Sequence, residues 1–294
     1  VAGHVRVVAE GAAHLYPVGL AGDAMVAVGA KQQVATLHRL AVDDLFELGV
    51  EFLTLLVQHI DHSGRPTLNL DLSMDSFDSI FQRAAKRKGG EAALEEILPK
   101  AATNRTLKGR PDSFYLAEMT KCVFRSGFVW QIIEAKWPGF EAAFDGFDVS
   151  SCAMLSDEDL ERLATDERIV RNAKKIQGVR GNALFIRDIR EEHGSFGAFL
   201  AGWPRQDFVG LWDLLKKRGE RLGGQTGRYF LRFVGWDTPV LSEDVVKALI
   251  GQGVIEKAPT SRKALAAVQD AFNSWHEESG RSFSEISRTL SATI

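Results

Sequence analysis

A glycine-rich turn beside a basic cluster is the clearest chemical feature of the sequence. In the segment KKRGERLGGQTGRYFLRFVG (216–235), three cations run into the turn and a helical pattern follows it. Lys and Arg favour the last turn of a helix, and Gly219 suits the left-handed residue just past it. Gly223 and Gly224 then precede the next helix, whose first N–H groups have no intrahelical acceptor. A phosphate can approach these N–H groups closely because no side chain is in the way.

Helix, glycine hairpin, helix is the helix-hairpin-helix arrangement, which binds the DNA backbone without reading base sequence. The alternative is an ordinary corner between two helices, with a glycine cap and solvated cations. The residues predicted to contact the DNA backbone are Arg218, Gly219, Arg221, Gly223, Gly224, Gln225, Thr226 and Arg228.

Helical periodicity places this hairpin in an all-α domain that covers residues 74–294. Phe77, Ile80, Phe81 and Ala84 follow the i, i+3, i+4, i+7 spacing of a helix face. Two helical segments are predicted around Ser126-Gly127, the second ending at Trp137-Pro138-Gly139. A long helix is predicted over 168–192, the hairpin over about 208–235, and further helices at 242–250, 261–278 and 283–291. No alternating strand pattern is found in this part of the sequence.

Residues 1–73 differ in composition from the rest of the chain. They hold five of the seven histidines, and the helical pattern begins only at Asp75, after a plausible natural start at Met74. Our hypothesis is that 1–73 is an over-extended N-terminus that is dispensable for folding and DNA binding. A small accessory domain is the alternative.

Composition excludes several classes of protein. The net charge of −3 gives no global nucleic-acid signal, so any DNA contact has to come from a local patch. Two cysteines, Cys122 and Cys152, are too few for a disulfide framework or an iron–sulfur cluster, and they suit a reducing cytoplasm. No apolar run is long enough to span a bilayer. We expect a cytoplasmic monomer without cofactor or membrane contact.

Several segments together resemble the DNA-3-methyladenine glycosylase I family of the helix-hairpin-helix glycosylase superfamily. They are LAEMTKCVFRSGFVWQIIEAKWPGFEAAFDGFD (116–148), LSDEDLERLATDERIVRNAKKIQGVRGNA (155–183) and GGQTGRYFLRFVGWDTPVLSEDVVKAL (223–249). The resemblance covers roughly residues 75–250. It implies two helical lobes with a pocket between them, double-stranded DNA with an alkylated base as partner, and hydrolysis of an N-glycosidic bond.

The chain departs from the family pattern at positions that matter for chemistry. Ser242 stands where the wider superfamily carries its catalytic Asp, which the methyladenine branch also lacks. Thr226 stands where bifunctional members carry a Schiff-base Lys, so no lyase activity is expected. The branch's pocket carboxylate falls on Cys122, and the nearest acid is Glu118, one helical turn earlier. Asp244 follows closely after Ser242, and Glu118 and Asp244 are the two candidate catalytic residues. The branch usually has a Cys/His zinc site, but the histidines that remain here lack ligand spacing, so no metal is expected.

A flipped, cationic methylated base would be held over aromatic faces. The resemblance places Phe124, Phe128 and Trp130 on the stretch that would line the base pocket, and Phe81 and Tyr115 are candidates to complete it. Core packing is the alternative for these aromatic side chains, and a surface ion pair is the alternative for Glu118.

Three classes of function remain open on the sequence alone. The first is a monofunctional alkylated-base DNA glycosylase, and the second is a non-catalytic helix-hairpin-helix protein that binds damaged or bent DNA. The third is a helical regulator whose basic turn only caps a helix. An aromatic-lined cleft between the 116–137 helices and the hairpin, with Trp130 facing it, favours the enzyme; a filled core there favours the binder.

Overall fold

The computed structural model describes residues 74–294, and this part of the chain is all-α, as predicted. The hypothesis about residues 1–73 therefore lies outside the described residues. No helix of the described part is long and apolar enough to cross a membrane. The helices are α3 (Phe77–Lys88), α4 (Glu91–Glu96), α5 (Asn104–Gly109), α6 (Asp112–Arg125), α7 (Trp130–Ala143), η1 (Asp145–Phe147), α8 (Val149–Ala153), α9 (Asp157–Thr165), α10 (Ala173–His193), α11 (Phe196–Gly202), α12 (Phe208–Arg218), α13 (Gln225–Phe233), α14 (Glu243–Gly251), α15 (Arg262–Ser279) and α16 (Phe283–Ala292).

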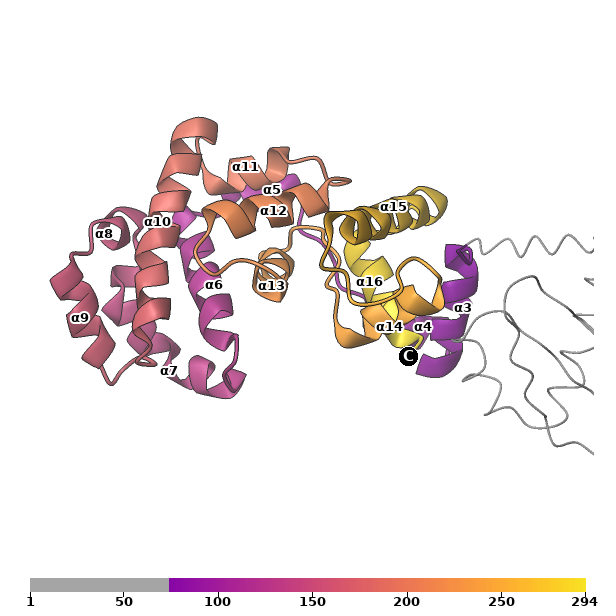
Figure 1. Ribbon diagram of the computed structural model, residues 1–294, viewed down its shortest axis with the longest axis horizontal. Helices are drawn as coiled ribbons and strands as arrows, with labels where there is room; N and C mark the ends of the chain where they lie inside the picture. The colour runs from indigo at the N-terminus through magenta and orange to yellow at the C-terminus, as the bar shows by residue number, and fades with distance from the viewer. Residues whose placement is uncertain (1–73) are drawn as a thin grey trace, which may run out of the picture. The chain divides into compact units, whose positions relative to one another are not determined.

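The described helices form two lobes (Figure 1). One lobe holds α5–α13, which are consecutive in the chain, with α10 packed against α6, α8, α9 and α11. The other lobe brings α3 and α4 together with α14–α16, which lie far along the chain. The described part of the chain thus begins in the second lobe, continues through the first and returns to complete the second.

Hydrogen bonds join the start of the helical region to its end. The Phe77 N–H donates to both carboxylate oxygens of Glu278 at 2.9 Å, and the Trp275 indole N–H donates to the Asp75 carbonyl at 3.1 Å. Phe77, Trp275 and Phe272 are buried beside these bonds. Because burial of each large aromatic side chain contributes about 1.5–3 kcal/mol, α3 is an integral part of the second lobe.

The segment 235–242, which follows α13, ties the two lobes together. The Trp236 indole N–H donates to the Leu200 carbonyl in the first lobe at 2.9 Å. The buried carboxylate of Asp237 accepts from the N–H groups of Phe283 and Ser284, at 3.1 and 2.9 Å, and so caps α16 in the second lobe. Trp236 therefore bonds to the first lobe and its neighbour Asp237 bonds to the second. These bonds fix the chain segment directly after α13 relative to both lobes.

Two helix boundaries differ from those predicted. Helix α7 continues past Pro138 to Ala143, because the Trp137 ring stacks on Phe140 and on Phe147, at centroid distances of 5.5 and 5.2 Å. Helix α10 begins at Ala173 rather than 168, because the Asn172 side chain accepts from the Lys175 N–H and caps the helix there.

Candidate functional site

The hairpin has an uncapped helix start. Gly224, at φ 60° and ψ −135°, is the N-cap residue of α13, and no side chain accepts a hydrogen bond from the first turn. Helix α14, by contrast, starts with Ser242, whose hydroxyl accepts from the Val245 N–H at 3.3 Å. The first N–H groups of α13 therefore lack the side-chain acceptor that most helices of this domain have, which is the arrangement that an anion can complete.

The hairpin packs against helix α10 at the GVRGNA sequence (178–183). The buried Asn182 amide donates to the Glu220 carbonyl at 3.1 Å, and its oxygen accepts from the Glu220 N–H at 2.8 Å. A Cβ at Gly181 would clash with the Glu220 side chain, so the hairpin packs directly on the helix backbone. The motif that carried much of the family resemblance thus positions the glycine hairpin.

Replacing Asn182 by alanine is expected to lower stability by about 1–3 kcal/mol, because the Glu220 backbone loses both partners in a partly buried place. Thermal melting of the full chain measures this loss, and affinity for duplex DNA should fall as well. The matched control is Gln177→Ala, an exposed polar residue on the same helix. Equal melting temperatures for the two variants would contradict this role of Asn182.

The glycines of the hairpin serve different purposes. Gly219 is extended, at φ −92°, so the left-handed cap predicted there is wrong. Glycine is needed at this position for another reason, because a Cβ would clash with the Leu222 side chain and the Leu215 carbonyl. Gly227 lies in the first turns of α13, where a Cβ would clash with the Leu222 carbonyl. Gly224 alone combines a positive φ with open space around the missing Cβ. The space above Gly224 is thus open to a ligand.

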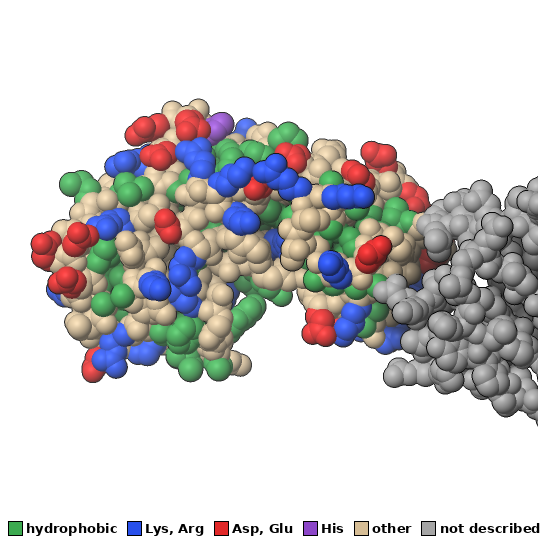
Figure 2. All heavy atoms as spheres, in the orientation of Figure 1, with side chains coloured by type: hydrophobic (Ala, Val, Ile, Leu, Met, Phe, Trp, Pro, Cys, Tyr) green, Lys and Arg blue, Asp and Glu red, His purple; other side chains and the backbone are tan. Residues whose placement is uncertain are grey.

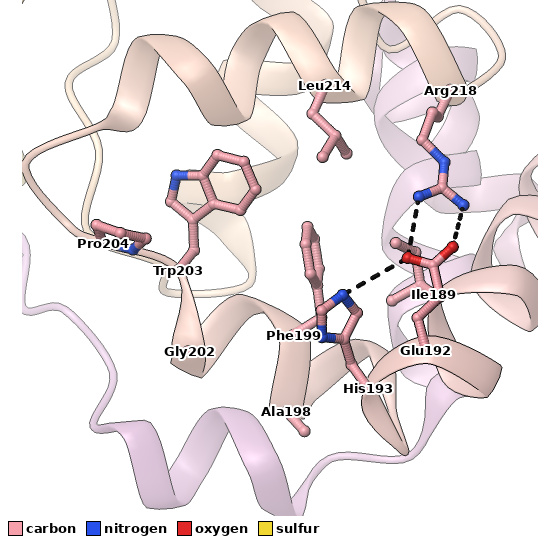
Figure 3. Close-up of a pocket in the computed structure, with 10 residues that line it drawn as sticks. All are labelled: Ile189, Glu192, His193, Ala198, Phe199, Gly202, Trp203, Pro204, Leu214 and Arg218. Carbon is pink, nitrogen blue, oxygen red and sulfur yellow. Dashed lines mark hydrogen bonds and ion pairs between the residues drawn. The ribbon is translucent and has the colours of Figure 1, made fainter.

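The three predicted phosphate-binding arginines lie in different environments. The Arg218 guanidinium pairs with Glu192 at 3.1 Å (Figure 3). Arg228 stacks on Trp212 at 4.2 Å, and burial lowers the pKa of its guanidinium to about 10. Arg221 is exposed, in the left-handed conformation at φ 62°. Of the three, Arg221 is the one placed to meet a phosphate without first leaving a protein partner.

Gln225 and Thr226 occupy the first two positions of α13. The Gln225 amide donates to the Leu241 carbonyl, which joins the hairpin to the segment before α14. Gly223 is not at positive φ, and the neighbour that a Cβ there would meet is the Lys216 side chain, at 3.2 Å. These residues frame the start of α13.

An aromatic cluster connects the start of α7 with the hairpin helix. The Trp130 ring packs edge-on against Tyr229 and Phe233 of α13, both at centroid distances of 6.0 Å. Trp130 is 44% exposed, and Phe128 and Phe233 are 39% and 38% exposed. Val129 and Ile132 add two further exposed apolar side chains. Clustered exposed aromatic side chains are typical of a binding surface.

Cations and one carboxylate surround this cluster. Arg125 at the end of α6 lies 5.1 Å from the ring centroids of both Trp130 and Phe233, and it binds Glu134. The buried Lys175 amine donates to the carbonyls of Phe124 and Ser126, at 3.1 and 2.6 Å. Burial, and to a smaller extent the charge of Arg221, lowers the pKa of Lys175. Lys175 thereby fixes the loop that carries Phe128 and leads to Trp130 at the start of α7.

The structure does not bring all the predicted pocket aromatics together. Tyr115 is fully buried, and its hydroxyl donates to the Leu107 carbonyl at 2.6 Å. Phe124 is buried and packs edge-on against Phe140 at 4.6 Å. Phe81 lies in α3, in the second lobe, where Arg281 covers its ring at 4.4 Å. These three belong to the core, whereas Phe128 and Trp130 lie at the surface.

The candidate acids come from different lobes. Glu118 is half-buried on α6, and its charge adds to burial in raising the pKa of the Cys122 thiol to about 12. Asp244 is half-buried in the first turn of α14, next to the Ser242 cap. The buried, protonated Cys122 cannot replace a carboxylate as a base at neutral pH.

Figure 2 shows an open notch between the two lobes, with hydrophobic side chains on the first lobe where it borders the notch. Helix α13 lies at this inner edge of the first lobe (Figure 1). Helix α13 follows the hairpin directly and also carries two rings of the aromatic cluster, Tyr229 and Phe233. Sequence reasoning missed Tyr229, Phe233 and Arg125 as members of the site; the aromatic face of the helix after the glycines was the available signal for the first two.

A second hollow lies among α10, α11 and α12 (Figure 3). It has a volume of about 230 Å³, and its mouth carries the Arg218–Glu192 pair, with the His193 imidazole 3.7 Å from Glu192. No sequence pattern predicted it. Its lining consists of Ile189, Glu192, His193, Ala198, Phe199, Gly202, Trp203, Pro204, Leu214 and Arg218.

The described residues contain no cluster of three or more His, Cys, Asp or Glu side chains that could hold a metal ion. Cys152, like Cys122, is buried and unpaired.

The described residues form an all-α fold in which a glycine hairpin joins α12 to α13, the helix-hairpin-helix arrangement predicted from the sequence. Residues 112–212 match the methyladenine glycosylase family model, which confirms the resemblance over α6–α11 and the first part of α12. The matched segment includes Trp130 at the start of α7 and the GVRGNA motif, and it ends before the glycines of the hairpin.

Individual proteins are similar to parts of this chain. DNA-3-methyladenine glycosylase 1 of Escherichia coli (strain K12) is 37% identical over 85 residues, which are 29% of this chain and 41% of that protein. The 3-methyladenine DNA glycosylase I of Staphylococcus aureus has a TM-score of 0.39 at 24% identity, covering 46% of this chain and 84% of that one. The 8-oxoguanine DNA glycosylase of Methanocaldococcus jannaschii has a TM-score of 0.45 at 16% identity, covering 71% and 91%. The chain thus spans less than half the length of the curated relative it matches.

Proposed function

We propose that this protein is a monofunctional DNA glycosylase that excises alkylated bases of the 3-methyladenine type. The observation that carries the proposal is that helix α13 contributes both to the glycine hairpin and to the aromatic cluster. Its uncapped start is suited to a DNA phosphate, and about one and two turns later its Tyr229 and Phe233 pack on the half-exposed Trp130. A nucleotide whose backbone is held at the hairpin can therefore present a flipped base to the aromatic cluster.

Cleavage of the glycosidic bond needs little catalytic assistance from the protein once the base is flipped. An N3-alkylated adenine is cationic in DNA and leaves as a neutral base, so the glycosidic bond breaks without strong general-acid help. Water then supplies the hydroxyl at the sugar carbon and releases its other proton to solvent. Glu118 and Asp244 are the carboxylates we propose for orienting that water or the base, one from each lobe.

A lyase step through an amine is not part of the proposal. Thr226 occupies the hairpin position of the superfamily's Schiff-base lysine. The nearby Lys175 is buried, and its amine is bound to two backbone carbonyls. Neither residue offers an accessible nucleophilic amine.

The partner we propose is double-stranded DNA with an alkylated base, bound by a cytoplasmic monomer that needs no cofactor. The experiment that tests the function is incubation of the purified chain with alkylated duplex DNA, followed by chromatography of the free bases. Release of a methylated base supports the proposal, and intact DNA with no free base contradicts it.

Arg221→Asn is expected to reduce the salt slope of DNA binding by about one, because it removes one exposed cation that neutralises a phosphate. Asparagine tolerates the left-handed conformation found at this residue, so the change removes charge without adding strain. The matched comparison is Arg218→Ala, which should change the slope less because Arg218 is paired with Glu192. Titrations with an abasic-site duplex between low and moderate salt measure both slopes, and equal slopes in both variants would contradict the assignment.

A second candidate, a non-catalytic binder of damaged or bent DNA, is favoured by one observation. Ser242, at the superfamily's acid position, is used as a helix cap, with its hydroxyl bound to the Val245 N–H. Tight binding to an abasic-site duplex together with absence of base release would support this candidate.

A further inference from the structure

Helix α10 contacts both parts of the candidate site. In its first turn the Lys175 amine donates to the carbonyls of Phe124 and Ser126, at 3.1 and 2.6 Å. Two turns further along, Asn182 binds both backbone groups of Glu220 in the hairpin. The rise between these two residues of α10 is about 10.5 Å. Because a regular helix holds its side chains at fixed spacing, α10 sets the place of the loop before α7 relative to the hairpin.

The Lys175 side chain is buried at the end of helix α6. The residue is 4% exposed, and its two acceptors are the carbonyls of the last turn and of the C-cap residue of α6. Carbonyls at a helix C-terminus have no intrahelical donor, and a cation is favourable there. The amine also lies 4.4 Å from the ring centroid of Phe128. Lys175 thus contacts the end of α6 and the loop that follows it.

The loop itself has little burial to hold it. Residues 126–130 are all exposed, and Gly127 takes a positive φ of 76°. The Phe128 N–H donates to the Arg125 carbonyl at 3.1 Å and closes a turn. A segment with few buried apolar contacts opens easily. The buried amine of Lys175 therefore supplies the anchor that the exposed side chains of the loop do not.

We propose that Lys175 is a positioning residue for base release. From α10 it keeps Phe128, and with it the start of α7 at Trp130, in a fixed place relative to the hairpin that Asn182 holds. This rests on the proposed function, since it concerns the base that the same cluster would bind. The role is separate from DNA affinity, because the hairpin contacts α10 through other residues.

Lys175→Met tests the proposal, because it keeps a long side chain and removes the donor. Single-turnover release at saturating protein is expected to fall by about 10- to 100-fold, the loss typical of a misplaced reacting group. The Kd for an abasic-site duplex should stay near the parent value. Asn182→Ala should show the opposite split, with weaker duplex binding and a smaller loss of the saturated rate. The matched control is Lys174→Met, the same change at the exposed neighbour, which should release base like the parent protein.

Hydrogen exchange tests the same contact without DNA. The Phe128 amide should be protected in the parent protein, because its turn is held shut at both carbonyls that Lys175 binds. In Lys175→Met it should exchange about 10- to 100-fold faster, while amides in the middle of α10 keep the parent rate. Circular dichroism establishes that the variant is folded. Unprotected exchange of the Phe128 amide in the parent protein contradicts the proposal even where Lys175→Met does not fold.

The outcomes separate this role from the proposed function. An unchanged saturated rate in folded Lys175→Met overturns the positioning role, whatever the exchange rate. A loss of release that only follows a loss of duplex affinity overturns it as well. No release of base by the parent protein overturns the proposed function, and exchange of the Phe128 amide then still decides whether Lys175 holds the loop.

Discussion

Replacement of Trp130 by alanine is expected to reduce base release by about 10- to 100-fold with little loss of stability. Stacking of one base on an aromatic side chain contributes about 1–3 kcal/mol, and Trp130 has the largest accessible ring of the cluster. The folding effect is small because 44% of this side chain is already exposed. Single-turnover release of base from an alkylated duplex measures the effect.

Trp130→Phe is the matched control, because it keeps an aromatic face beside Tyr229 and Phe233. It should retain most of the activity. A fully active Trp130→Ala would show that the exposed ring is a surface feature and that the base is held elsewhere.

Replacement of Gly224 by valine should weaken binding to an abasic-site duplex by about two orders of magnitude. The valine Cβ would project into the open space above the start of α13, where a phosphate would otherwise reach the free N–H groups. Loss of two charge-assisted hydrogen bonds at about 1.5 kcal/mol each, the lower end of their usual range, accounts for this size. Fluorescence anisotropy with the labelled duplex measures it.

Gly253→Val controls for backbone strain. Gly253 has a similar φ, 69° against 60° at Gly224, and also has nothing near its missing Cβ, but it follows α14 in the second lobe. The two variants should lose similar stability, and only Gly224→Val should lose DNA binding. If both bind like the parent protein while folded, the hairpin is an ordinary capped corner.

The sequence was sufficient for the helices and for the place of the hairpin. Periodic apolar positions such as Phe77, Ile80 and Phe81 reported a buried face, and Gly223-Gly224 marked the turn before α13. The helix ends were harder, because stacking of Trp137 on Phe140 and Phe147 outweighs the proline that ought to end α7. Such stacking depends on tertiary contacts that no local pattern contains.

The members of the site were predicted less completely. Phe124 and Phe128 are four residues apart on one stretch, yet one is core and the other surface, because α6 ends between them at Arg125. The pairing of Arg218 with Glu192 joins α12 to the end of α10, which lie 26 residues apart in the chain. Asn182 could be recognised as part of a motif. Its two hydrogen bonds to the Glu220 backbone could not be predicted, because they depend on the packing of α10 against the hairpin.

Release of free base from a duplex with a single 3-methyladenine tests the central claim most directly. The chain without substitution is compared with Trp130→Ala and Gly224→Val under single-turnover conditions, and the products are separated by chromatography with and without alkaline treatment. The account predicts free 3-methyladenine from the parent protein, strand breaks only after alkali, and strong loss of release in both variants. Tight binding of the same duplex by the parent protein with no base released would contradict it.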